Sequence, residues 1–206
     1  MSVKNADEYL TVSSQPVSSE IKVSDSKFIG HVFHVLSKRQ AESVYSNIKR
    51  KYHDATHNCF AYRISADEFR YSDDGEPSGT AGLPIYKVLV NKDLSQTLII
   101  ITRYFGGTKL GTGGLIHAYA DAALDVLNKT NIETKIRYVT VTVETTYDNM
   151  SLLLDLCNKH GGIIGKTEYT EKISFCLQIP STKFEDFDKK IIAFAERGIV
   201  IVDKEN

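Results

Sequence analysis

Residues 102–119 read TRYFGGTKLGTGGLIHAY and hold five of the chain's 13 glycines. The preceding residues, QTLIIIT, form a near-continuous apolar run, which is typical of a strand buried on both faces. From about Gly113 to Leu127 the apolar residues recur at helical spacing. The pattern therefore predicts a buried strand, a glycine-rich turn and a helix.

The segments before this stretch predict further strands and helices. Residues 1–19 are polar and serine-rich, and we expect a flexible N-terminal arm there. Two alternating runs flank a turn at Ser24-Asp25-Ser26 and predict a pair of strands, and a helical pattern follows over residues 38–53. Two short strands, the loop SDDGEPSGTAG (72–82) and a short helix at about 83–91 complete this part.

The segment after residue 136 has an order of its own. The pattern predicts a strand over 137–147, a helix over 149–160, strands over 162–170 and 172–180, a helix over 182–197 and a strand over 199–203. This order is that of the split βαβ, or ferredoxin-like, arrangement. We therefore predict an α+β protein with one domain over residues 20–133 and a second over residues 136–206.

Composition limits the classes of function. The 206-residue chain has a formal net charge of −1, so no overall positive field would attract nucleic acid, and a polyanion site must be a local patch. Three cysteines without a CxxC pair favour free thiols in a reducing compartment. No run reaches the roughly 18 apolar residues of a membrane span. We expect a cytoplasmic protein.

The glycine-rich turn has two interpretations from the residues alone. Helix N-termini present free N–H groups that suit phosphate, and Arg103 and Lys109 would add positive charge. The alternative is a tight packing corner that needs glycine for its backbone. The stretch matches neither the P-loop nor the G-x-G-x-x-G motif.

Three other clusters carry charged or metal-binding residues. Asp73, Asp74 and Glu76 form either a site for a hard cation or a structural loop. The group His53, His57 and Cys59 lacks an evident fourth ligand, so we predict no metal site. The helix over 38–53 ends in a basic run, which extends an anion-binding patch only if it lies near the turn: Lys49, Arg50 and Lys51.

Several sequence motifs of this chain, taken together, indicate a protein family more specifically than any one of them alone. SDDGEPSGTAGLPI, followed by TRYFGGTKLGTGGLIHAYADAA, resembles the YigZ/IMPACT family, and DATHNCFAYRI and SKFIG match it upstream. With the βαββαβ tail, the resemblance is to the bacterial-type, two-domain form. It implies an N-terminal domain like ribosomal protein S5 domain 2 and a ferredoxin-like C-terminal domain. It also implies a link to translation control and to nucleic acid, with no established enzymatic activity, so no catalytic residue or cofactor is predicted.

The leading hypothesis is a regulatory protein that binds RNA or the ribosome. The expected phosphate- or RNA-binding residues are Arg103, Tyr104, Gly106, Gly107, Lys109, Gly111, Gly113, Gly114, His117, Lys49, Arg50 and Lys51. His117 departs from the family pattern, which usually has Arg or Lys there, so anion binding would be weaker or more dependent on pH.

Two rival hypotheses remain open. One is a phosphate- or nucleotide-binding enzyme that uses the same turn with a magnesium ion at Asp73, Asp74 and Glu76. The other is an adaptor that binds a partner protein through the C-terminal sheet.

Overall fold

The computed structural model describes residues 6–203. The chain divides into two compact units, one formed by residues 9–135 and the other by residues 6–8 together with 136–203. Within the described residues no helix is long and apolar enough to cross a membrane.

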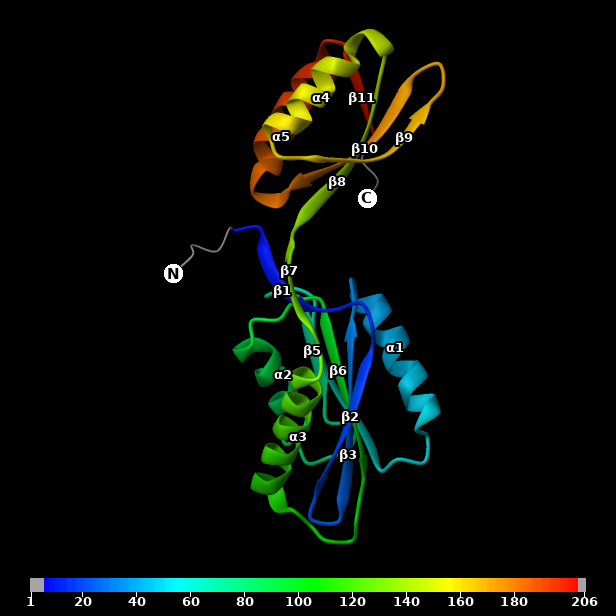
Figure 1. Ribbon diagram of the computed structural model, residues 1–206. Helices are drawn as coiled ribbons and strands as arrows, with labels where there is room; N and C mark the ends of the chain where they lie inside the picture. The colour runs from blue at the N-terminus through cyan, green and yellow to red at the C-terminus, as the bar shows by residue number, and fades with distance from the viewer. Residues whose placement is uncertain (1–5, 204–206) are drawn as a thin grey trace. The chain divides into compact units, whose positions relative to one another are not determined.

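The first unit is built on a five-stranded antiparallel sheet in the order β2-β3-β6-β4-β5 (Figure 1). The strands are β2 (Val17–Val23), β3 (Ser26–His34), β4 (His57–Arg63), β5 (Phe69–Ser72) and β6 (Thr97–Tyr104), and the helices are α1 (Lys38–Lys51), α2 (Gly82–Asn91) and α3 (Gly111–Asn128). Helix α1 covers one face of the sheet, and α2 and α3 cover the other.

The central strand β6 explains this layering. Ile99 and Ile101 pack in the core beneath α2 and α3, whereas Leu98 and Ile100 pack beneath α1. All four side chains are fully buried, which confirms the prediction of a strand covered on both faces.

The predicted flexible arm is corrected for residues 8–19. Residues Glu8–Val12 form strand β1, which pairs with β7 (Ile132–Ile136), and β2 begins at Val17. Tyr9, Thr11 and Val12 are buried. The pairing of two segments more than a hundred positions apart stabilises a stretch whose own composition is polar. Residues 1–5 of the predicted arm lie outside the described residues.

The second unit has the predicted ferredoxin-like topology. Its elements are β8 (Tyr138–Thr145), a 3₁₀ turn η1 (Tyr147–Asn149), α4 (Met150–Lys159), β9 (Ile163–Tyr169), β10 (Ile173–Pro180), α5 (Ser181–Glu196) and β11 (Val200–Asp203). The sheet order β11-β8-β10-β9 places the first and third strands at the centre. Both helices cover one face, where Leu153, Phe175 and Phe187 lie in the core. The α+β class is therefore confirmed.

Candidate functional site

The glycine-rich turn joins β6 to α3, and the architecture requires three of its five glycines. A Cβ on Gly106 would lie 2.0 Å from backbone atoms of Asp25 in the β2–β3 turn, so only glycine fits there. Gly107 and Gly111 have φ angles of +92° and +72°, a region that side-chain-bearing residues rarely adopt. To this extent the turn is a tight packing corner.

The last two glycines have different surroundings. A Cβ on Gly113 would meet no atom within 4 Å, and the φ angle of Gly113 is not positive. A Cβ on Gly114 would lie 3.1 Å from the Cβ of Leu110. Neither packing nor backbone conformation accounts for glycine at position 113. Because glycine has no side chain, the first turn of α3 stays accessible at this position.

The backbone N–H groups at the N-terminus of α3 also lack a capping side chain at the N-cap position. Leu110 occupies the N-cap position, its side chain makes no capping hydrogen bond, and the first turn carries no acidic residue. The first amides of a helix have no partner within it and carry partial positive charge. Lys109 is exposed beside them and has no ion-pair partner among the described residues. This arrangement can bind an anion.

A hollow of about 380 Å³ lies against this helix end, and we call it the turn hollow. Its lining residues are Glu76, Pro77, Arg103, Phe105, Lys109, Leu110, Gly111, Thr112 and Leu115. Phe105 is 46% exposed, and its ring lies 5.5 Å from the guanidinium carbon of Arg103. The sequence alone does not decide whether Phe105 is buried, because a lone aromatic residue at a strand end belongs to no periodic pattern.

Arg103 is buried beneath the turn. Its Nη1 donates to Glu76 Oε1 at 2.6 Å and its Nη2 to Ser26 Oγ at 3.2 Å. Its Nε has no hydrogen-bond partner among the described residues. The sequence expected Arg103 to supply a free charge to phosphate, whereas the structure already balances that charge with a carboxylate.

The same carboxylate binds a short buried network. The Tyr119 hydroxyl donates to Glu76 at 2.7 Å, and the Cys59 thiol lies 3.4 Å from the Tyr119 oxygen. Burial raises the pKa of the Cys59 thiol, and burial likewise raises that of the Tyr119 hydroxyl. Both groups therefore stay protonated at neutral pH. Through these hydrogen bonds the network connects the loop that follows β5 to the sheet and to α3.

The three carboxylates of the 72–82 loop, those of Asp73, Asp74 and Glu76, each accept from different protein groups. Asp73 accepts from the backbone N–H groups of Gly79, Ala81 and Gly82 at 2.8–3.0 Å, which satisfies the N-terminal end of α2. Asp74 accepts from the Asn58 amide and from Lys49 Nζ, both at 2.7 Å. No group of three metal-ligating side chains occurs among the described residues. The carboxylates of this loop thus accept from protein N–H and O–H groups.

The basic end of α1 lies on the opposite face of the sheet from α3, but at the same end of the unit as the turn. The Tyr104 hydroxyl donates to Asp54 at 2.9 Å and the Phe105 amide to Thr56 at 3.0 Å, which ties the segment after α1 to the turn. Lys49 is paired with Asp74, as described above. Arg50 and Lys51 are exposed and form no ion pair with a described residue.

The remaining candidates lie around these groups. Tyr104 is half-buried, with Lys27 Nζ 4.8 Å from its ring centre, and His117 is exposed one turn along α3 from Gly113. His57 Nδ1–H donates to the Asp74 carbonyl at 2.9 Å and Nε2 lies 3.9 Å from Glu76 Oε1, so His57 contacts the 72–82 loop. The sequence does not show which helix end Asp73 reaches, because that depends on how the 72–82 loop folds back on α2.

Comparison with known proteins supports the resemblance found in the sequence. The family model for the Impact N-terminal domain matches residues 24–127, and the model for a domain of unknown function, DUF1949, matches residues 143–196. The chain is 35% identical to the IMPACT family member YvyE of Bacillus subtilis over 81% of this chain and 77% of that protein. It is 26% identical to the IMPACT family member YigZ of Escherichia coli over 93% and 96% of the two chains.

A solved structure and a human relative complete the comparison. A crystal structure described as that of a hypothetical protein matches 98% of this chain and 99% of its own, with a TM-score of 0.68 and 25% identity. Human Protein IMPACT is 28% identical over 50% of this chain but only 34% of its own length. The chain therefore belongs to the IMPACT family and has the two-domain architecture of its bacterial members.

Proposed function

We propose that this protein is a translation-associated regulatory protein that binds RNA or the ribosome through the turn between β6 and α3. It acts by binding rather than by catalysis. Membership of the IMPACT family supports the link to translation, because the sequence resemblance implies that role. The three free cysteines fit a cytoplasmic location.

One observation carries the proposal: glycine at position 113 leaves the uncapped first turn of α3 open where packing would tolerate a side chain. A phosphate oxygen approaching the helix end would accept from these amides, and a Cβ at this position would stand in its path. Lys109, which forms no ion pair with a described residue, adds positive charge next to the same amides. Arg103 contributes its positive charge from below, although Glu76 largely balances it.

Neighbouring groups extend the interface. Phe105 presents an exposed ring next to the turn hollow, and single-stranded RNA is commonly bound by stacking of its bases on aromatic rings. Arg50 and Lys51 lie at the same end of the unit and would contact the continuing backbone. Tyr104 and His117 lie at the margins of this surface.

The experiment measures binding of a fluorescein-labelled single-stranded RNA by anisotropy at several salt concentrations. Replacement Lys109→Ala should weaken binding and reduce the slope of log affinity against log salt by about 0.7, the value for one lost phosphate contact on a single strand. Lys109→Arg should keep the slope, and Lys38→Ala, an exposed lysine at the far end of α1, serves as the control. An unchanged slope in Lys109→Ala would remove this lysine from the interface.

A further inference from the structure

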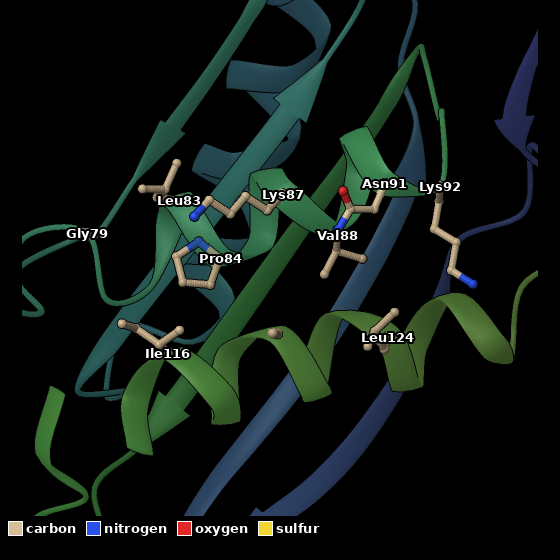
Figure 2. A pocket seen from close by; sticks show the side chains of 10 residues that line it. Gly79, Leu83, Pro84, Lys87, Val88, Asn91, Lys92, Ile116 and Leu124 are labelled. Atoms are coloured by element: carbon tan, nitrogen blue, oxygen red, sulfur yellow. The ribbon is translucent and has the colours of Figure 1, made fainter. Parts of the chain in front are cut away.

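The outer side of helices α2 and α3 holds a second concavity, which we call the α2–α3 groove. It has a volume of about 380 Å³ and is lined by Gly79, Leu83, Pro84, Lys87, Val88, Asn91, Lys92, Ile116, Ala120 and Leu124. Figure 2 shows Ile116 and Leu124 rising from α3 towards Pro84 and Val88 of α2. None of these residues lines the turn hollow, so the groove is a separate surface.

The floor of the groove is an apolar stripe of regular spacing. Ile116, Ala120 and Leu124 follow one another at intervals of four residues and so form one ridge about 12 Å long on α3. Ile116 is 41% exposed, and Ala120 and Leu124 are half-buried. A partly exposed apolar ridge beside a groove is a surface that another molecule can cover.

The charged side chains that line the α2–α3 groove are all positive. Among the described residues that line the groove, the only charged side chains are Lys87 and Lys92. Neither of them forms an ion pair with a described residue. An occupant that places carboxylates beside its apolar side chains would therefore be complementary to both the floor and the rim.

We infer that the α2–α3 groove binds an amphipathic helix of a partner protein that presents apolar residues at intervals of one turn and acidic residues beside them. The groove is lined by the two helices α2 and α3, so a third helix can insert its ridge of side chains between them. Neither helix offers a free strand edge with which an extended peptide could pair. RNA fits this surface poorly, because no aromatic side chain for base stacking lies among the described lining residues.

The test uses two synthetic peptides of about 16 residues, which is long enough for measurable helicity. Both carry leucines at one-turn spacing, but one has glutamates and the other lysines beside them. Binding is measured by anisotropy, and its location by the amide chemical shifts of the ¹⁵N-labelled full chain. We expect the acidic peptide to bind more tightly and to shift amides of α2 and α3, with little change in the turn at 106–114.

Three variants separate the contributions. Lys87→Glu/Lys92→Glu should weaken binding of the acidic peptide about tenfold and should now favour the basic peptide, because two attractive rim pairs become repulsive. Lys22→Glu/Lys38→Glu introduces the same change of charge away from the groove and should leave both affinities unchanged. Ala120→Phe should fill the groove and abolish binding while thermal unfolding shows a folded protein.

Several results would overturn the inference. Equal affinity for the two peptides, or shifts outside α2 and α3, would show that the groove does not select an acidic helix. Self-association of the unliganded chain that Ala120→Phe abolishes would identify the groove as an interface between copies of this chain instead. The charge-reversal variants alter exposed side chains, so their outcome remains interpretable even if Ala120→Phe does not fold.

Discussion

The replacement Gly113→Ala separates the anion-binding role of the turn from its architectural role. Alanine at this position meets no atom within 4 Å, and the backbone there is helical with a φ angle that is not positive. Alanine is better than glycine in such a position by about 0.5–1 kcal/mol, because it restricts the unfolded chain. The variant should therefore be slightly more stable than the wild type but should bind RNA more weakly.

The neighbouring glycine supplies a matched control. Gly111 also has open space around its missing Cβ, but its φ angle is +72°. Gly111→Ala should therefore lower the free energy of unfolding by about 1–2 kcal/mol through backbone strain. Two identical substitutions two residues apart thus have opposite predicted effects on stability.

The assay is denaturant unfolding monitored by circular dichroism, with and without a single-stranded RNA oligonucleotide. Bound RNA stabilises the wild type by mass action, and the same RNA should stabilise Gly113→Ala much less. If the RNA-induced stabilisation is equal in the two proteins, the open helix end is not the binding site. If Gly113→Ala is strongly destabilised, the assignment of open space around it is wrong.

Three further predictions concern other parts of the molecule. Arg103→Ala should lower the free energy of unfolding by about 3–5 kcal/mol, because it leaves the buried carboxylate of Glu76 without its cation; a loss below about 1 kcal/mol in chemical denaturation would contradict this. Burial, reinforced by a nearby lysine, lowers the pKa of His31 from 6.5 to about 4. Between these two pH values the unfolded chain therefore carries a proton on His31 that the folded chain does not. The stability from this histidine should be complete above pH 6.5 and should fall by up to about 3 kcal/mol as the pH drops to 4. His31→Gln should flatten that part of the stability profile, and an unchanged profile would exclude His31 as its cause. Asp7 accepts from the Thr182 amide at 2.8 Å and from its hydroxyl at 2.5 Å, so Asp7→Ala should cost about 1 kcal/mol and speed amide exchange in the first turn of α5, whereas unchanged exchange would contradict a capping role.

Elements with strong periodicity could be predicted from the sequence. The helix over 38–53, the buried strand before the turn and the βαββαβ order of the second unit all depend on local patterns of apolar residues. Strands β1 and β7 could not be predicted in the same way, because their pairing depends on contacts between segments far apart in the chain. Polar composition alone suggested an arm where the structure forms a strand.

The candidate site shows the same division. The sequence identified the glycine-rich turn and both charged residues beside it, but could not tell that Arg103 is buried against Glu76 while Lys109 is exposed. Nor could it separate the glycines that the backbone requires from Gly113, since that distinction depends on φ angles and on atoms from the β2–β3 turn. Burial and partner choice are properties of the assembled fold.

The most direct test of RNA binding at the turn is a titration of the ¹⁵N-labelled full chain with a single-stranded RNA oligonucleotide at low salt. The amide resonances of residues 106–114 should shift progressively, and added salt should reverse these shifts as the phosphate contacts are lost. Shifts confined to other surfaces, such as the outer face of the β8–β11 sheet, with an unchanged turn would contradict the proposed function.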